Sequence, residues 1–416
     1  MYTCFSLCAT LIRLCRCGSK KKIAKQSMQK IMKPLLATAL ISWLVATAAC
    51  QRKNDERIYP RVEPPSSVLS YVFKKGTEGY SCYRIPALIK TKSGAMLAFA
   101  EGRKNNCADE GDIDLVVKRS TDGGKTWSPL SVIWSDGVHT CGNPAPVVDQ
   151  HTGKIHLLMT WNDGDDDIGE INSGTSKNTR RVFVTSSSDD GKTWETPKEI
   201  TTTVKQPNWG WYATGPCHGI QLTQGPHKDR LVIPCDYIEV GPGRRGNSHV
   251  IYSDDAGSTW TLGGIVPVDP ALNPNESTVT ELSDGRLMLN MRVGSNNNQR
   301  IYSISDDGGA SWSPLVQAPS LTDPVCQGSL TSGTTGNGFA VFFSNAASTQ
   351  RRDMTVKMST DDGISWTKQK LIFGGPSGYS DLLMLDDNTL ALLFEAGVGA
   401  YTDGIAFKII PVSDLK

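Results

Sequence analysis

The sequence lacks the features that point to several common classes of protein. Its 43 Lys and Arg residues balance 42 Asp and Glu residues, so the net charge of +1 provides no long-range attraction for a polyanion. It contains no glycine-rich loop that would cradle phosphate groups, and nucleotides are therefore poor candidate ligands. Its six histidines follow no metal-site spacing, and neither do the cysteines. We expect no nucleic-acid partner, no metal and no cofactor.

A long amphipathic helix is also missing. Instead, 40 Gly and 22 Pro residues, with many Asp-Gly and Asn-Gly pairs, separate short alternating segments such as 231–233 and 287–291. Turn residues between short alternating runs are typical of an all-β protein.

One octapeptide pattern, Ser-x-Asp-x-Gly-x-Thr/Ser-Trp, occurs five times. Its Asp residues are separated by 67, 66, 52 and 54 positions, and they are Asp122, Asp189, Asp255, Asp307 and Asp361. This period is about one four-stranded antiparallel blade, which cannot bury its own faces and needs neighbours. Asp and Gly suit a tight turn, Ser or Thr can bond the turn backbone, and Trp fills the gap between neighbouring sheets.

The repeat predicts the fold. Without its first fifty residues the chain is still long for one ordinary domain, but its length is natural for six blades arranged around a centre. We therefore predict that residues 71–416 form one all-β domain, a six-bladed β-propeller of four-stranded antiparallel sheets. The octapeptides resemble the aspartate boxes of sialidases and related propellers, in which they brace the rim without touching substrate, so we interpret all five as structural.

The first fifty residues have the composition of an export signal. Six lysines lie within residues 20–33, and an apolar stretch follows at 35–49. That stretch is too short to span a bilayer comfortably. We interpret residues 28–50 as the signal, residues 1–27 as lying upstream of the true start, and residues 51–70 as a linker.

The signal ends in Ala-Thr-Ala-Ala-Cys at residues 46–50, which resembles a bacterial lipoprotein signal. In such signals the cysteine becomes the lipidated first residue of the mature protein. The resemblance implies a periplasmic or cell-surface lipoprotein whose membrane contact is made only through lipid at Cys50. The alternative is plain cleavage after Ala49 and a secreted soluble protein.

After Cys50, six cysteines remain: Cys82, Cys107, Cys141, Cys217, Cys235 and Cys326. An even number in an exported chain permits three disulfides in fifteen pairings, and the sequence does not choose among them. A core of this size needs no covalent staples, so we interpret most of these cysteines as small buried apolar residues.

Arginine is the informative residue type. Arg84 lies in a Tyr-Arg-Ile-Pro motif, and Arg292 ends a strand-like run. Arg351 and Arg352 precede another such run. Arginines from different blades, each at a strand end, would converge on the mouth of a propeller, where planar guanidinium groups bind a carboxylate in fork geometry.

With these motifs the sequence resembles bacterial exo-sialidases, and similarly the lysosomal sialidase of animals, over residues 71–411. The resemblance implies an arginine triad that binds the C1 carboxylate of sialic acid, with Arg84 first and Arg292 second. Arg351 takes the third place, because the family spacing is Arg-x-x-Leu/Met, and Arg352 is the alternative.

Sialic acid also explains the nucleophile that the resemblance implies. Its anomeric carbon bears a carboxylate, which repels an Asp or Glu nucleophile, whereas a neutral phenol avoids this repulsion. The matching residue is Tyr379, and a phenol needs a base to become nucleophilic at neutral pH. Glu276 matches that base.

The remaining site residues also follow from the resemblance. Asp109, in the loop 104–111, matches the acid/base that protonates the leaving oxygen. Arg103 looks like a further pocket arginine paired with Glu101, and Glu395 matches the carboxylate that orients Arg84. Two aromatic residues resemble the segment that lines the glycerol and N-acetyl side of the pocket, and they are Trp211 and Tyr212.

Together these residues predict an exo-α-sialidase. It would hydrolyse terminal α-linked sialic acid from glycoproteins, glycolipids and oligosaccharides, with retention, through a tyrosyl-enzyme intermediate. Two alternatives stay open: a trans-sialidase, because water and an acceptor sugar compete for the same intermediate, and a non-catalytic propeller that binds sialic acid. Sialylated glycans are the expected partners, and we expect a monomer.

Overall fold

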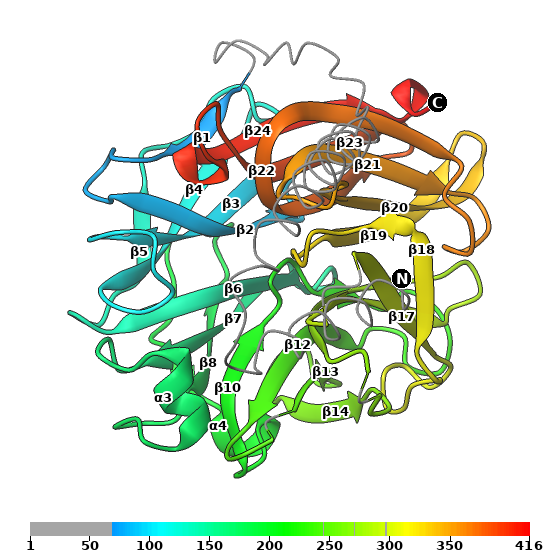
Figure 1. The fold of residues 1–416 in the computed structure, drawn as a ribbon. Helices are drawn as coiled ribbons and strands as arrows, with labels where there is room; N and C mark the ends of the chain where they lie inside the picture. The colour runs from blue at the N-terminus through cyan, green and yellow to red at the C-terminus, as the bar shows by residue number, and fades with distance from the viewer. Residues whose placement is uncertain (1–68, 244, 270, 296–297) are drawn as a thin grey trace, which may run out of the picture. The chain divides into compact units, whose positions relative to one another are not determined.

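The computed structural model describes residues 69–416 apart from 244, 270, 296 and 297. The predicted start, export signal and lipidation site at Cys50 therefore lie outside the described residues. The described strands form six four-stranded antiparallel blades that follow one another in chain order around a centre (Figure 1). The all-β, six-bladed prediction is confirmed.

Each blade extends from an inner strand at the centre to an outer strand at the rim. In that order, blade I contains β2 (Cys82–Lys90), β3 (Met96–Arg103), β4 (Ile113–Ser120) and β5 (Ser131–Trp134). Blade II contains β6 (Thr140–Val148), β7 (Ile155–Asn162), β8 (Arg181–Ser187) and β9 (Lys198–Glu199). Blade III contains β10 (Trp209–Thr214), β12 (Leu231–Glu239), β13 (Gly246–Ser253) and β14 (Thr261–Ile265), with β11 (Ile220–Gln221) beside β12.

Blade IV contains β15 (Pro274–Glu281), β16 (Leu287–Val293), β17 (Gln299–Ser305) and β18 (Val316–Thr322). Blade V contains β19 (Ser329–Thr335), β20 (Gly338–Ala346), β21 (Arg352–Ser359) and the first part of β22 (Lys368–Asp386). Blade VI contains the rest of β22, β23 (Thr389–Ala396), β24 (Gly404–Pro411) and β1 (Tyr71–Lys74). Short helices lie in loops, and they are α3 (Ile168–Ser173), α4 (Thr201–Val204), η3 (Tyr401–Asp403) and η4 (Val412–Asp414).

Two strands close the ring of blades. The 19-residue strand β22 pairs first with β21 and then with β23, so one continuous strand is the outer strand of blade V and the inner strand of blade VI. The N-terminal strand β1 pairs with β24 and completes blade VI from the outside. The last blade is thus built from both ends of the described chain, which ties the first segment to the last.

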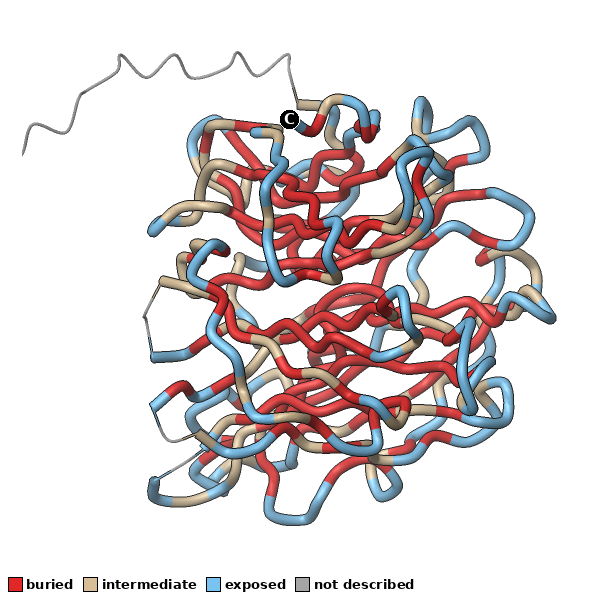
Figure 2. Tube along the Cα trace, turned by 90° about the vertical axis from the view of Figure 1, so that its right-hand side faces the viewer, coloured by how far each residue is buried: buried red, intermediate tan, exposed pale blue. Residues whose placement is uncertain are grey.

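The hydrophobic core is divided among the interfaces between neighbouring blades. Side chains alternate between the two faces of a strand, so each strand supplies two interfaces. In β16, Leu287, Leu289 and Met291 pack against blade III, whereas Met288 packs against blade V. Buried positions accordingly run through the strands, and exposed positions gather at the connecting loops (Figure 2). Every blade therefore depends on both neighbours.

Each octapeptide connects the third and fourth strands of one blade, in blades I to V. In the first, Ser120 Oγ donates to Asp122 Oδ1 at 2.9 Å, and the N–H and hydroxyl of Thr126 bind the two carboxylate oxygens at 3.0 and 2.5 Å. The other four repeat this pattern. The hydrogen bonds from Thr126, followed by that from Ser120, lower the pKa of Asp122 to about 2.

The box tryptophans pack against the preceding blade. The Trp127 ring lies 5.3 Å from that of Phe407 in blade VI, and the Trp194 ring lies 5.9 Å from that of Phe99 in blade I. Blade VI has no octapeptide because its third and fourth strands, β24 and β1, come from opposite ends of the chain and no hairpin joins them. Five boxes in six blades thus follow from the way the ring closes.

Strand direction separates the boxes from the other edge of each blade. Because neighbouring strands are antiparallel, the start of the first strand, the end of the second and the loop after the second meet at one edge. The boxes follow the third strand and lie at the opposite edge. Side chains at the first edge therefore take no part in the hydrogen bonds of the boxes.

The Asp381 carboxylate, fully buried on β22, binds three of the other inner segments. One oxygen accepts the Leu88 N–H at 2.7 Å and the His218 N–H at 3.1 Å. The other accepts His218 Nδ1 at 2.7 Å and Ser329 Oγ at 2.8 Å. Burial lowers the pKa of His218, but the Asp381 charge outweighs it and the net shift is upward. Asp381 thus joins blades I, III, V and VI.

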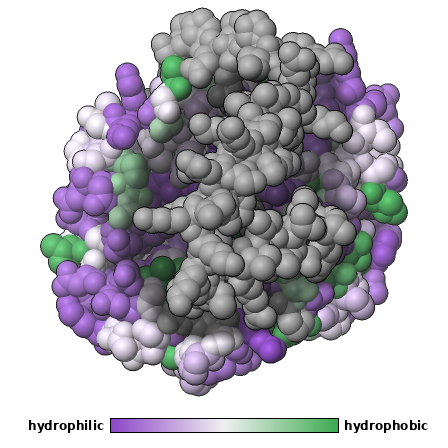
Figure 3. All heavy atoms as spheres, in the orientation of Figure 1, coloured by the Kyte–Doolittle hydropathy of each residue, from purple (hydrophilic) through white to green (hydrophobic). Residues whose placement is uncertain are grey.

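The visible part of the described surface is mostly hydrophilic, with apolar residues in small separate patches (Figure 3). None of the helices in the described part of the chain has the length and apolar character needed to cross a membrane.

Replacing the central carboxylate should weaken the whole fold. We expect Asp381→Ala to reduce the free energy of unfolding by about 3–5 kcal/mol, because four hydrogen-bond donors lose their buried partner. Urea unfolding followed by tryptophan fluorescence measures this loss. Asp387→Ala, at an exposed position beyond the end of the same strand, is the matched control. Equal unfolding midpoints for the two variants would contradict the assigned role.

Candidate active site

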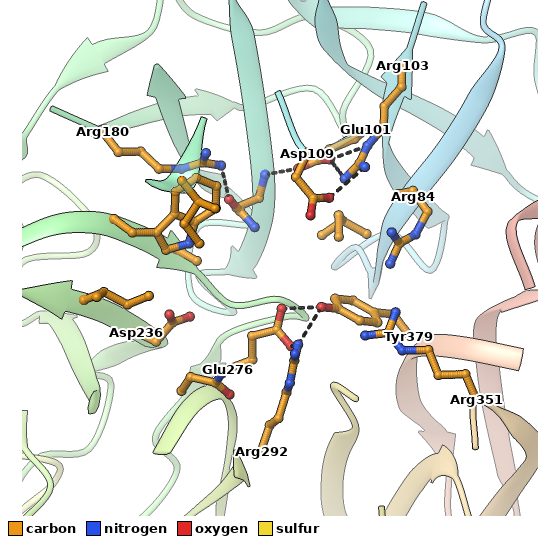
Figure 4. Close-up of a pocket in the computed structure, with 17 residues that line it drawn as sticks. Arg84, Glu101, Arg103, Asp109, Arg180, Asp236, Glu276, Arg292, Arg351 and Tyr379 are labelled. Carbon is orange, nitrogen blue, oxygen red and sulfur yellow. Dashed lines mark hydrogen bonds and ion pairs between the residues drawn. The ribbon is translucent and has the colours of Figure 1, made fainter. Parts of the chain in front are cut away.

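A polar pocket of about 210 Å³ opens at the edge of the blades opposite the boxes. Figure 4 shows the side chains that line it. Its walls come from first-strand starts, second-strand ends and the loops that follow, in all six blades. Charged and phenolic side chains dominate the lining, and they are Arg84, Glu101, Arg103, Asp109, Arg180, Asp236, Glu276, Arg292, Arg351 and Tyr379. Segments more than 290 residues apart in sequence thus meet in one cavity.

Glu395 lies beneath this pocket and orients Arg84. Its fully buried carboxylate accepts the Arg84 Nε–H at 2.6 Å and the Ile85 N–H at 3.1 Å through one oxygen. The other oxygen accepts the Tyr379 N–H at 3.0 Å. The terminal nitrogens of Arg84 make no hydrogen bond to another described residue, so they remain available to a ligand.

Arg351 lies close to the same tyrosine. Its guanidinium carbon is 5.5 Å from the centre of the Tyr379 ring, and that of Arg84 is 5.0 Å away. Arg351 donates to Tyr401 Oη at 3.3 Å and pairs with no carboxylate in the described part of the chain. Arg352 instead pairs with Asp353 at 3.0 Å and does not line the pocket. Of the two candidates for the third arginine, the structure places Arg351 at the cavity.

Tyr379, Glu276 and Arg292 form a hydrogen-bonded triad. The Tyr379 hydroxyl donates to Glu276 Oε1, and Arg292 Nη1 donates to Glu276 Oε2 at 2.5 Å and to the phenol oxygen at 3.0 Å. Burial and the charge of Glu276 raise the pKa of Tyr379 well above 10, although the nearby arginines oppose this shift. The phenol is therefore protonated at neutral pH, with a carboxylate in contact to take its proton and a cation in contact to stabilise the phenolate.

Asp109 is on the opposite side of the cavity, in the loop between β3 and β4. Its side chain is 66% exposed and pairs with Arg103 Nη1 at 2.8 Å, and Arg103 is held by Glu101 through Nε at 3.0 Å and Nη2 at 2.6 Å. Loss of water on the side that faces the pocket raises the pKa of Asp109, but the positive charges of Arg103 and Arg84 outweigh this and lower it. Asp109 is ionised in the free protein, and an anion bound at Arg84 would favour its protonation.

A disulfide fixes the loop that carries Asp109. Cys107, two residues before Asp109, is bonded to Cys82, two residues before Arg84. Arg103 Nη1 also donates to the carbonyls of Cys107 and Ala108, at 2.6 and 2.7 Å. The remaining described cysteines are buried free thiols, and they are Cys141, Cys217, Cys235 and Cys326.

Alternation along β10 separates the two aromatic residues predicted to line the pocket. Trp211 lines it, whereas Tyr212 points to the opposite face, is fully buried between blades II and III, and bonds His249 Nε2 at 2.9 Å. Tyr212 belongs to the core rather than to the pocket, because neighbouring residues of a strand point to opposite faces.

Three polar or charged pocket residues lie outside the motifs that the sequence showed: Asn143, Arg180 and Asp236. Arg180 is fully buried, and its guanidinium carbon lies 3.8 Å from the centre of the Trp211 ring. Asn143 and Asp236 stand on first and second strands with no motif around them. What these residues share is their place in the blades, at the same edge as Arg84 and Arg292. That place can be assigned only when the bounds of the strands are known.

Lys205 supports this side of the pocket from behind. Its ammonium donates to Thr179 Oγ1 at 2.6 Å and to the Arg180 carbonyl at 2.5 Å. A third bond reaches the Gly210 carbonyl at 2.6 Å. Burial, followed by the charge of Arg180, lowers the pKa of Lys205 to about 7. Lys205 thereby connects the backbones that carry Arg180 and Trp211.

Within residues 69–416, leaving aside the four undescribed positions, no group of three or more His, Cys, Asp or Glu side chains is arranged to hold a metal ion. The chemistry of the pocket is that of arginines, carboxylates and one phenol.

Removing the disulfide should loosen the Asp109 loop. In the double variant Cys82→Ser/Cys107→Ser, we expect amide hydrogen exchange in residues 104–111 to become about tenfold faster or more, because the covalent restraint is lost and only non-covalent contacts, such as the Arg103 hydrogen bonds, still hold the loop. Mass-spectrometric hydrogen exchange measures this, with residues 120–127, the first box, as internal control. Unchanged exchange in 104–111 would show that the disulfide does not position the loop.

Comparison with known proteins places the chain in a family. The model of a BNR repeat-like domain matches residues 94–392. A sialidase of Micromonospora viridifaciens is 34% identical over 88% of this chain and 58% of its own length. An exo-alpha-sialidase of Arthroderma benhamiae is 33% identical over 76% of this chain and 79% of its own length. The solved structure of the Hadza microbial sialidase Hz136 matches with a TM-score of 0.75 and 31% identity, over 84% of this chain and 69% of that chain.

This chain spans less than two thirds of two of the bacterial relatives, 58% of the Micromonospora sialidase and 64% of a Bacteroides fragilis sialidase. The BNR match nevertheless extends over most of the chain, and the Arthroderma relative is covered over most of its length. The chain belongs to the sialidase family of BNR-repeat proteins.

Proposed function

We propose that the protein is an exo-α-sialidase that releases terminal α-linked sialic acid from glycoproteins, glycolipids and oligosaccharides with retention of configuration. The observation that carries this proposal is the triad of Tyr379, Glu276 and Arg292 beside Arg84 and Arg351. A phenol in contact with a carboxylate base and surrounded by arginines suits attack on a carbon that itself bears a carboxylate.

The arginines explain how substrate is held. Arg84 and Arg351 present nitrogens that no carboxylate of the described chain occupies, and Arg292 lies beside them. A carboxylate in this position forms charge-assisted hydrogen bonds in fork geometry. The anomeric carbon attached to it then lies near the Tyr379 oxygen, because the guanidinium carbons of Arg84 and Arg351 are 5.0 and 5.5 Å from the centre of the Tyr379 ring.

In the first step, the Tyr379 oxygen forms a bond to the anomeric carbon while the glycosidic C–O bond breaks. The phenolic proton moves to Glu276, and Asp109 protonates the leaving oxygen. In the second step, Asp109 takes a proton from water, the water oxygen attacks the anomeric carbon, and the tyrosine oxygen leaves and recovers its proton from Glu276. Two displacements at one carbon give retention.

The charge state of Asp109 agrees with this sequence of steps. In the free protein the arginines lower the pKa of Asp109, so it is a carboxylate. The substrate carboxylate neutralises part of that positive field, which raises the affinity of Asp109 for the proton that it must donate. Binding of the correct substrate thus prepares the acid.

We also propose that the protein acts outside the cytoplasm, as a periplasmic or cell-surface lipoprotein or a secreted enzyme. Residues 20–50 support this through their export-signal composition. The Cys82–Cys107 disulfide supports it independently, because disulfides persist in oxidising compartments.

The stereochemistry of the product tests the mechanism. We expect NMR of the protein acting on 3'-sialyllactose in water to show the α-anomer of sialic acid first, followed by mutarotation, because two displacements restore the configuration. Release of the β-anomer first would exclude the tyrosyl intermediate. Saturable binding of the sugar without release of sialic acid would indicate a non-catalytic sugar-binding propeller. A sialylated acceptor sugar, or an anhydro form of sialic acid, in place of free sialic acid would indicate a trans-sialidase.

The leaving group tests the role of Asp109. We expect Asp109→Ala to lower kcat/KM on 3'-sialyllactose by about a hundred- to ten-thousand-fold, because the sugar oxygen needs a proton to leave. On an activated aryl sialoside, whose phenolate leaves without one, we expect a much smaller loss. The neighbouring Glu110→Ala is the matched control. Equal losses on both substrates would refute the acid role.

A further inference from the structure

Arg84, Arg292 and Arg351 together form what we call the arginine clamp. The side of the pocket away from this clamp contains a carboxyl group with no partner. Asp236, near the end of β12, is 3% exposed and lines the cavity. Its Oδ1 is buried without a hydrogen bond, and no described residue forms a hydrogen bond or ion pair with the carboxyl group. A buried carboxyl group that lacks a partner is destabilising, so such a group at the wall of a cavity indicates that a ligand supplies the missing bond.

The surroundings of Asp236 favour its neutral form. Burial and the negative charge of Glu276 raise its pKa well above the ordinary value, and the charges of Arg292 and Arg180 oppose them. A neutral carboxylic acid offers one O–H donor and an acceptor oxygen. A hydroxyl group matches this pair of functions, because it also accepts one hydrogen bond and donates another.

Each nitrogen of the neighbouring Arg180 already donates one hydrogen bond within the protein. Its nitrogens donate to Thr160 Oγ1 at 3.1 Å, to Asn162 Oδ1 at 2.7 Å and to Asn143 Oδ1 at 2.5 Å. Its flat face is covered by Trp211. Asn143 Oδ1 accepts a second bond from Thr160 at 3.0 Å, so the amide NH₂ of Asn143 is left as a donor for the cavity. This wall therefore presents neutral hydrogen-bonding groups beside an arginine whose three nitrogens are each already bonded within the protein.

Apolar side chains complete the wall. Ile168, Ala213 and Ile238 line the same cavity and give it surfaces that suit C–H groups. Neutral hydrogen-bonding groups next to apolar surface fit a chain of carbons that bear hydroxyl groups.

The clamp decides which part of a sialic acid faces this wall. Arg84, Arg292 and Arg351 belong to blades I, IV and V, so a sugar held by its carboxylate extends toward blades II and III. Glu276 lies near the anomeric carbon and is close enough to Asp236 to raise its pKa. The anomeric carbon of sialic acid, C2, has two neighbours in the sugar ring. On one side, C3 carries no hydroxyl group. On the other side, across the ring oxygen, C6 carries the polyol tail, which is therefore the nearest hydroxyl-bearing substituent.

We propose that Asp236 is a specificity-determining residue that exchanges hydrogen bonds with a hydroxyl of the polyol tail of sialic acid. This inference rests on the proposed function, because it takes the arginine clamp as the site of the substrate carboxylate. It assigns to Asp236 a direct contact with substrate but no part in bond breaking.

A cycle of variants and substrates tests the contact. The intact substrate is 3'-sialyllactose, and the second is the same sugar with its tail shortened by mild periodate oxidation and borohydride reduction. We expect Asp236→Ala to lower kcat/KM about tenfold or more on the intact sugar, and to change it less than about twofold on the shortened one. Asp236→Asn should stay within about threefold of the native protein on both, since the amide also donates and accepts hydrogen bonds.

Equal losses for Asp236→Ala on the two sugars would overturn the proposal, because a merely structural role does not depend on the tail. No loss on the intact sugar would overturn it as well. If the protein does not hydrolyse the sugars, calorimetry gives the dissociation constants of the intact and the shortened sugar for the native protein and for Asp236→Ala, and these constants allow the same comparison. A native protein that binds both sugars without hydrolysis would count against the proposed enzyme function, while the ratio of binding constants still decides the role of Asp236.

Discussion

The arrangement of the pocket depends on the buried Asp381 carboxylate at the centre of the propeller. It accepts hydrogen bonds from Leu88, His218 and Ser329, which belong to three blades, while it stands itself on a fourth. Tyr379 is two residues earlier on the same strand and packs with Ile85 of blade I and with Cys326, which precedes the inner strand of blade V. The position of the phenol is thus set by the contacts that hold the inner strands together, and the Glu395 carboxylate adds a second constraint through the Tyr379 N–H.

The second constraint is electrostatic. The pocket concentrates arginines, and most of them are held by carboxylates in or beneath the cavity wall: Glu395 for Arg84, Glu101 for Arg103 and Glu276 for Arg292. Such pairing keeps each guanidinium in a fixed orientation without saturating all of its donors. The residual positive field lowers the pKa of Asp109. In the proposed mechanism, the groups that would bind the substrate carboxylate would therefore also control the protonation of the acid, and binding and acid catalysis would be coupled through one local charge balance.

The fold separates stability from chemistry by strand direction. The five boxes brace the blades at one edge, with their tryptophans packed on the preceding blade, and the pocket is at the other edge. A change at the pocket edge, where Asp236, Arg180 and Asn143 lie, is therefore expected to leave the hydrogen bonds of the boxes intact. The Cys82–Cys107 disulfide is an addition at this edge, where it fixes the loop that carries Asp109 relative to the strand that carries Arg84.

The sequence by itself determined the features that repeat or that lie in a local motif. Five octapeptides at a blade-sized period predicted the propeller, since each box is a turn whose hydrogen bonds stay within eight residues. Arg84, Asp109, Glu276, Arg292 and Tyr379 were located by the short motifs around them, and all of them line the cavity; their catalytic roles remain predictions. Only the tertiary structure decided which of Arg351 and Arg352 faces the cavity and that Trp211 rather than Tyr212 does so, because both depend on strand register. It also selected one disulfide among many pairings and brought Asn143, Arg180 and Asp236 together, because these contacts join residues that are adjacent in space and distant in sequence, and no local pattern records which blades become neighbours.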